Sequence, residues 1–155
     1  MAFFRSNGSR RPNVVVVEDF DFVHKAIRGK FPNHWRIKKV QTRDDALKSR
    51  FDKADAIVLD VNMPVRVASL WDRLVRGKHR LDGQVLDPHG FEIAERLIAS
   101  GHGHKIVLFS DRGDVPAFCE KHGIAHVTKQ RVMNLKLLDQ DAAKLAEAVK
   151  KVVGE

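Results

Sequence analysis

The sequence has very little cysteine and no long apolar segment. Cys119 is the single cysteine among 155 residues, which excludes an internal disulfide framework. No apolar run approaches the ~18 residues needed to cross a bilayer, so we expect no membrane insertion. The N-terminal segment MAFFRSNGSRRP lacks the uninterrupted apolar stretch of a signal peptide. We therefore expect a cytoplasmic protein.

The signatures of common nucleic-acid-binding modules are also missing. There is no zinc-finger spacing, no RNA-binding aromatic motif and no evident helix-turn-helix. The formal net charge is +8, from 28 basic and 20 acidic residues, and a basic surface can favour nucleic acid or an acidic partner. The basic residues are spread along the chain in small clusters. Nucleic acid is therefore not an expected partner, while an acidic partner stays open.

Length and composition predict one folded domain. Apolar residues make up 43% of the chain and charged residues 31%, an ordinary balance for a globular protein. We expect residues 1–12 to form a disordered basic tail and residues 13–155 to form a single domain.

Short apolar runs alternate with segments of helical spacing. Continuous apolar runs predict strands that are covered on both faces, and we expect them at 14–17, 35–40, 56–59, 106–109 and 124–128. Apolar residues at three- and four-residue steps predict helices over 22–31, 44–51, 91–98, 115–122 and 142–152. Five alternations of strand and helix indicate a doubly wound α/β fold with a parallel sheet.

Polar residues follow the predicted strands where they end. Glu18 and Asp19 follow the first strand, and Asp60, Ser110 and Lys129 follow three others. The carboxyl ends of parallel strands form the ligand edge of such a sheet. Acids gathered there repel one another and need a cation, and an all-oxygen cluster suits Mg²⁺.

A hydroxyl and an ammonium beside these acids suit a phosphate group. Ser110 can donate a hydrogen bond, and Lys129 supplies a point charge. Asp60 can then act as a carboxylate nucleophile that forms an acyl phosphate, with Mg²⁺ neutralising the charge that develops.

The segments VVVVEDF, IVLDVNMP, GFEIAERL, IVLFSD and HVTK together resemble the receiver domain of two-component response regulators. The resemblance runs from Val14 to the final helix, and IVLDVNMP is its most specific part. It implies a flavodoxin-like (βα)5 fold with five parallel strands. It also implies that Glu18 and Asp19 help to hold Mg²⁺, that Asp60 accepts the phosphoryl group, and that Asn62 offers its backbone carbonyl to the metal.

By the same resemblance, Ser110 is the switch hydroxyl and Lys129 the site lysine, but the surrounding pattern departs from the family. Asp111 follows Ser110 where the family has a small residue, and it could repel phosphate or cap the next helix. His126 stands at the aromatic switch position, as a switch or as a filler. Gln130 replaces the usual proline after Lys129, so the family's cis-peptide geometry is in question there.

An insertion of roughly twenty residues, at about 65–89, separates the phosphoacceptor strand from the next helix. Its apolar residues have the spacing of an amphipathic helix. Such a helix could fold back on its own domain, cover the site as a lid, or dock a partner.

The leading hypothesis is a single-domain response regulator that accepts a phosphoryl group on Asp60 from a histidine kinase or phosphotransfer protein. Because no output domain follows the last helix, we expect signalling by contact with a downstream target protein or a homodimer partner. We expect no enzymatic activity beyond self-catalysed phosphorylation and dephosphorylation. One alternative is a degenerate pseudo-receiver that binds partners independently of phosphorylation. Another is a Mg²⁺-dependent phosphatase, which would need an acid where Asn62 stands.

Overall fold

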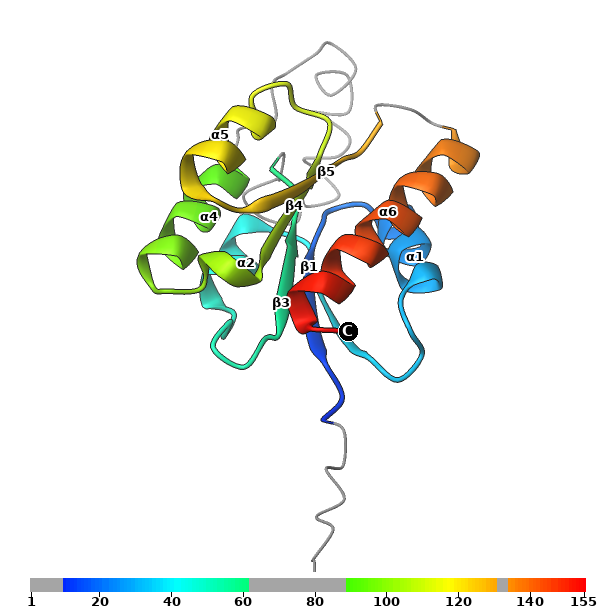
Figure 1. The fold of residues 1–155 in the computed structure, drawn as a ribbon, viewed down its shortest axis with the longest axis horizontal. Coiled ribbons are helices and arrows are strands. Elements are labelled where there is room, and N and C mark those ends of the chain that lie inside the picture. The colour runs from blue at the N-terminus through cyan, green and yellow to red at the C-terminus, as the bar shows by residue number, and fades with distance from the viewer. Residues whose placement is uncertain (1–9, 62–88, 131–133) are drawn as a thin grey trace, which may run out of the picture.

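One parallel five-stranded sheet forms the centre of the computed structural model, which describes residues 10–61, 89–130 and 134–155. The spatial order of the strands is β2-β1-β3-β4-β5, so the chain reverses its direction of travel across the sheet after β2 (Figure 1). The strands are β1 (Asn13–Val17), β2 (Arg36–Val40), β3 (Ala56–Leu59), β4 (Ile106–Ser110) and β5 (Ala125–Thr128).

Helices cover both faces of the sheet, as Figure 1 shows. Helices α1 (Asp21–Lys30) and α6 (Leu135–Val153) pack together on one face. Helices α2 (Arg43–Lys48), α4 (His89–Ala99) and α5 (Val115–His122) lie on the other face. A short 3-10 turn, η1 (Gly103–Lys105), leads into β4. This is the flavodoxin-like (βα)5 arrangement that the sequence predicts.

The central strands are buried on both sides because each alternate residue meets a helical layer. In β1, Val14 and Val16 pack against the layer of α1 and α6. Val15 and Val17 pack against the layer of α2, α4 and α5. All four are at most 5% exposed, so the strand has no polar alternation and appears in the sequence as an unbroken apolar run.

Two helices have bounds that differ from those that their apolar patterns predict. Helix α2 ends at Lys48. Phe51, which the pattern predicts to be helical, lies in the loop that follows, and its side chain is buried. Helix α6 begins at Leu135, seven residues before the predicted start at 142. Its first turn is fixed by Asn134, whose side chain accepts hydrogen bonds from the backbone N–H groups of Lys136 and Leu137.

Parts of the predicted tail and insertion lie outside the described residues, namely 1–9 and 62–88. At the tail boundary, Pro12 is buried and its carbonyl accepts a hydrogen bond from Arg36 N at 2.8 Å. At the insertion boundary, His89, placed in the insertion by the sequence, is the first residue of α4. No helix in the described part of the chain combines the length and apolar character needed to span a membrane.

Cys119 provides a test of the core packing. Its side chain is 2% exposed between α5 and the sheet, and burial raises the pKa of the thiol to about 11. Because only the thiolate attacks disulfide reagents, the native thiol should react with DTNB at pH 8 at least roughly a hundredfold more slowly than the unfolded chain. Comparable rates in buffer and in guanidinium chloride would contradict this packing.

Candidate functional site

The sheet hydrogen bonding continues one residue past three strands, and this places the candidate site. Glu18 N donates to Val40 O at 2.9 Å, and Asp60 N donates to Val17 O at 2.9 Å. Lys129 N donates to Ser110 O at 3.1 Å. The site residues therefore have backbones fixed by the ladder, and their side chains leave the carboxyl edge of the sheet.

Three carboxylates converge on this edge. Glu18, Asp19 and Asp60 each offer one oxygen, and these oxygens lie within 4.8 Å of one another. Glu18 and Asp60 are only 1% and 3% exposed, so water screens their charges poorly. The sequence predicted this cluster, and the fold brings all three residues together.

Lys129 provides the positive charge within the cluster. Its Nζ lies 2.9 Å from Glu18 Oε2 and 3.2 Å from Asp60 Oδ2. The same ammonium lies 5.7 Å from the centre of the Phe109 ring, which adds a cation–π contact. Lys129 therefore links the ends of β1 and β3 from the end of β5.

Burial and charge shift the pKa values of these groups. Burial alone would lower the pKa of Lys129, but Glu18 and Asp60 outweigh it and raise that pKa, so the ammonium stays charged. Burial raises the pKa of Glu18 to about 7, against the opposing effect of Lys129. Burial, together with the nearby charge of Asp60, also raises the pKa of Asp19. Because their pKa values are raised, Glu18 and Asp19 keep their protons to a higher pH than exposed carboxyl groups do.

The donor set fits a hard divalent cation. Carboxylate oxygens are the ligands that Mg²⁺ and Mn²⁺ accept, and Asp19 is only partly buried, which leaves room for water in the coordination shell. A divalent ion would reduce the repulsion among the three carboxylates. Asn62, whose backbone carbonyl the sequence assigned to the metal, lies outside the described residues.

Ser110 is the last residue of β4 and is 2% exposed. Its Oγ accepts a hydrogen bond from the backbone N–H of Arg112 at 3.4 Å. The guanidinium of Arg112 makes two hydrogen bonds of 3.0 and 2.9 Å to Asp114, and it lies 5.8 Å from the centre of the Phe91 ring on α4. The loop after Ser110 is thus tied to both α5 and α4.

Two of the predicted departures have a definite place in the structure. Asp114, not Asp111, occupies the N-cap position before the first turn of α5. His126 lies on β5 opposite Leu108, and it is exposed instead of turned into the core.

The third departure, Gln130, has a partner that the sequence did not suggest. Its backbone N–H donates to Asp141 Oδ2 at 2.9 Å, and Asp141 is a buried acid of α6 at 3% exposure. Proline has no N–H and could not make this bond. The bond fixes the chain directly after Lys129. The signal in the sequence was Asp141 itself, because an acidic residue on the apolar side of the final helix indicates a buried hydrogen-bond partner.

Gly90 is a second residue whose role sequence reasoning missed. A Cβ added there would lie 2.3 Å from Asp60 O and 2.4 Å from Val61 Cα, both backbone atoms. Gly90 N also donates to Val61 O at 2.9 Å. The start of α4 therefore packs directly on the backbone that carries Asp60, and a side chain has no space there.

Comparisons with known proteins agree with this architecture. No family model and no curated protein matches the sequence. The structure is similar to the response regulator domain of CheB from Thermotoga maritima, with a TM-score of 0.66, 15% identity, and coverage of 94% of this chain and 98% of that one.

Two further solved structures are similar over most of their length. The phosphorylated cyanobacterial phytochrome response regulator RcpA matches with a TM-score of 0.62 and 15% identity, covering 89% of this chain and 93% of that one. The Mn²⁺-bound form of the response regulator Rcp1 matches with a TM-score of 0.59 and 14% identity, covering 86% and 91%. The chain therefore has the receiver-domain fold of response regulators, as the resemblance implied.

A first prediction for this site concerns Gly90. Gly90→Ala should reduce the free energy of unfolding by about 1–3 kcal/mol, because the methyl group overlaps backbone atoms that cannot turn away. Gly29→Ala, in α1 with open space around its Cβ position, is the matched control and should stabilise the protein by up to about 1 kcal/mol. Urea unfolding of both variants measures the contrast, and equal effects would contradict the close approach.

A second prediction concerns the pH dependence of stability without metal. The folded pKa of Glu18, about 7, lies above its ordinary value of 4.5, so the folded state holds a proton that the unfolded state releases. This contribution is complete below pH 4.5 and is lost as pH rises through 7, by about 3 kcal/mol in all.

Urea unfolding in EDTA between pH 4.5 and 8 tests this. The stability of the wild type relative to Glu18→Gln, which has no carboxyl to titrate, should decline across that range. MgCl₂ should stabilise the wild type more at pH 8 than at pH 6, because protons compete with the ion. A difference between the two proteins that does not change with pH would show that Glu18 is not held protonated by burial.

Proposed function

We propose that this protein is a single-domain response regulator that accepts a phosphoryl group on Asp60 from a histidine kinase or phosphotransfer protein. The observation that carries the proposal is the placing of Lys129 Nζ between Glu18 and Asp60, 2.9 and 3.2 Å from their oxygens. One nucleophile, a further pair of acids, a hydroxyl and an ammonium then share one sheet edge.

The reaction follows from the carboxylate of Asp60. One of its oxygens attacks the phosphorus of a phosphohistidine, the P–N bond breaks, and the imidazole leaves and takes up a proton from solvent. Asp60 then carries an acyl phosphate. Water can later attack the same phosphorus, which releases inorganic phosphate and restores the carboxylate. Both reactions, the transfer to Asp60 and the later hydrolysis, are self-catalysed at this site.

Glu18, Asp19 and Asp60 are the residues that would hold Mg²⁺. When bound, the ion supplies neutralisation of the charge that develops on the phosphoryl oxygens. The Mn²⁺-bound form of Rcp1, a protein of similar fold, supports a divalent ion in such a site. The chain's own residues supply the rest, since the buried ladder holds Asp60 in a fixed direction.

Lys129 and Ser110 are the groups that would follow phosphorylation. The ammonium of Lys129, which now contacts Glu18 and Asp60, could instead contact a phosphoryl oxygen. The hydroxyl of Ser110 could donate a hydrogen bond to another phosphoryl oxygen. Either movement would pull on the loop at Arg112 and on the chain from Lys129 to α6. RcpA, a protein of similar fold, has been solved in a phosphorylated form, which supports phosphorylation of a protein with this fold. Output would then be a changed contact with a target protein or a second copy.

Intact mass spectrometry after incubation with Mg²⁺ and phosphoramidate tests the proposal. The wild type should gain the mass of one phosphoryl group, and hydroxylamine should remove it, as it removes acyl phosphates. Asp60→Asn should gain nothing. Asp52→Asn, which changes an exposed aspartate away from the site, is the matched control and should be phosphorylated as the wild type is.

A folded wild-type protein that gains no mass with any small phosphodonor would contradict the proposal. It would point instead to a protein-interaction module that works without phosphorylation. A gain that persists in Asp60→Asn would place the acceptor elsewhere. Circular dichroism of each variant confirms that the fold is intact.

A further inference from the structure

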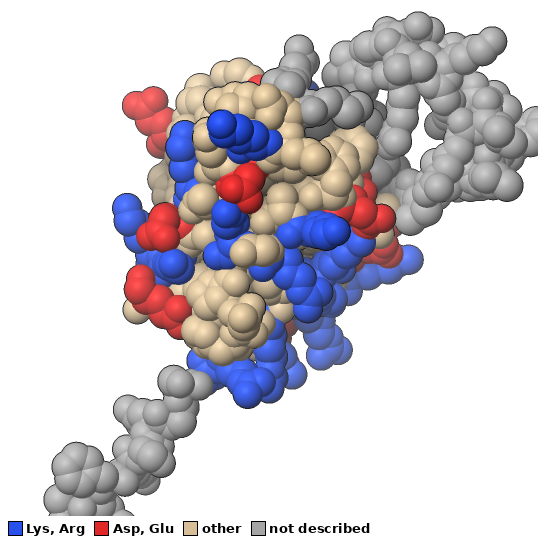
Figure 2. Space-filling model, turned by 90° about the vertical axis from the view of Figure 1, so that its right-hand side faces the viewer, with Lys and Arg blue, Asp and Glu red and all other residues tan. Residues whose placement is uncertain are grey.

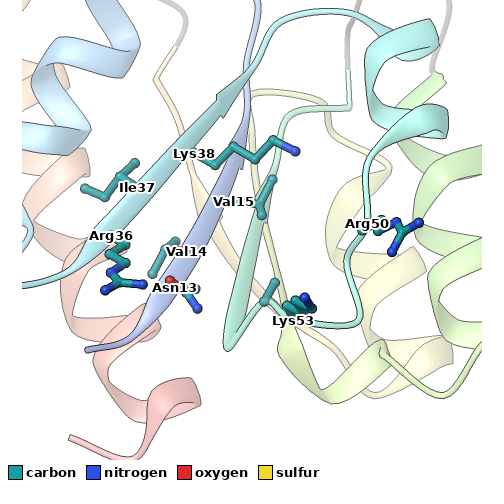
Figure 3. Close-up of a pocket in the computed structure, with 9 residues that line it drawn as sticks. Asn13, Val14, Val15, Arg36, Ile37, Lys38, Arg50 and Lys53 are labelled. Carbon is teal, nitrogen blue, oxygen red and sulfur yellow. The ribbon is translucent and has the colours of Figure 1, made fainter. Parts of the chain in front are cut away.

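A basic groove lies at the opposite end of the sheet from the carboxylates. It has a volume of about 220 Å³ and is bordered by four basic side chains, Arg36 and Lys38 from β2 and Arg50 and Lys53 from the loop between α2 and β3. Val15 and Ala54, both at most 5% exposed, form apolar lining. Figure 3 shows Lys38 extending from β2 toward the side on which the loop with Arg50 and Lys53 lies.

The shortness of α2 leaves this groove open. In the parallel register, Arg36 is opposite Asn13 and Lys38 opposite Val15, so both cations share the sheet face that α2 covers. The six residues of α2 span about 9 Å, whereas the five residues of β2 span about 16 Å. Val40 at the far end of β2 is buried, and the half of the strand nearer its start is not covered.

The four cations have no acidic partners in the described part of the chain. None of them takes part in an ion pair there, and no Asp or Glu lines the groove. An adjoining hollow of about 390 Å³ shares Lys38 and adds Lys39 and Lys48, with Asp45 as its one acid. Figure 2 shows Lys and Arg side chains gathered toward one end of the face that it presents. The surface is therefore complementary to a negatively charged partner.

The groove runs beside a sheet edge with which no other described strand pairs. Strand β2 is the outermost strand on its side. Arg36 N–H and Val40 O bond inward to the β1 segment, so the backbone groups of the alternate residues Ile37 and Lys39 face outward. An extended peptide can pair with such an edge, and its alternate side chains, about 6.7 Å apart, would then face Arg36 and Lys38.

Size and composition select among anionic ligands. The groove is smaller than the ~300 Å³ lower limit of small-molecule sites, so it suits one or two side chains. No aromatic residue lines it, although aromatic rings are the surfaces on which the bases of single-stranded nucleic acids stack. An acidic peptide fits both the edge and the charges.

We propose that β2 and its basic groove bind an extended acidic segment of a partner protein, which adds as a strand beside β2 with alternate carboxylates on Arg36 and Lys38. The site lies at the amino ends of the strands, at the opposite end of the sheet from Asp60. It gives a response regulator a docking surface remote from its phosphoacceptor.

Fluorescence anisotropy tests the proposal with the full chain and two labelled eight-residue peptides, one alternating Glu and Thr and one with four Glu followed by four Thr. The alternating peptide should bind more tightly, because only its carboxylates follow the strand period. Lys38→Glu with Lys53→Glu should weaken binding at least about tenfold. Lys25→Glu with Lys121→Glu, two exposed lysines on α1 and α5, makes the same change in net charge and should weaken it less than about threefold.

Several results would overturn the proposal. Equal losses in the two double variants, or equal binding of the two peptides, would show general electrostatic attraction only. Tighter binding of a ten-nucleotide oligothymidine, lost in the same groove variant, would assign the groove to nucleic acid. If neither peptide binds at 50 mM salt, the proposal is wrong, and the lysines beside β2 serve instead to keep this edge from pairing with a second copy. If circular dichroism shows that the charge-reversal variant is misfolded, Lys38→Gln with Lys53→Gln repeats the test.

Discussion

The arrangement of this protein depends on one electrostatic constraint, the gathering of three carboxylates at a sheet edge, where Lys129 lies between two of them. Glu18 and Asp60 are almost fully buried, and each contacts the same ammonium. Removing one partner from such a cluster leaves a buried charge unpaired, which is a costly state. The cluster responds by retaining protons, as the raised pKa of Glu18 shows, or by binding a divalent cation. The same cluster of carboxylates offers the oxygen ligands that a hard divalent cation accepts.

The rest of the fold holds that cluster in place through backbone contacts. Ladder hydrogen bonds extend to Glu18, Asp60 and Lys129 themselves. Gly90 brings the start of α4 against the carbonyl of Asp60 with no space for a side chain. Asp141 of α6 holds the chain directly after Lys129. Helices on both faces of the sheet are thus attached to the edge that carries the carboxylates, so a change at Asp60 could reach surfaces on either side of the sheet.

The two ends of the sheet carry opposite charge. Acids lie at the carboxyl ends of the strands, and four cations that form no ion pair with another described residue border the groove at the amino ends, where the short α2 does not cover all of β2. The net charge of +8 is therefore not only a solvated background, because part of it surrounds a groove beside a free strand edge. A partner that recognises the basic end would contact residues other than the carboxylate cluster.

The sequence by itself determined the parallel sheet and the set of acids, because buried parallel strands are continuous apolar runs and strand ends at one edge must meet. Glu18, Asp19, Asp60, Ser110 and Lys129 were predictable for that reason. It could not set the start of α6, where Leu135 after the cap at Asn134 is an apolar residue that stays 73% exposed, or the early end of α2. Only the tertiary structure decided the roles of Gly90 and Asp141, because each acts through a contact with a backbone distant in sequence. The basic groove too depends on which face Arg36 and Lys38 share, and strand register, not composition, fixes that face.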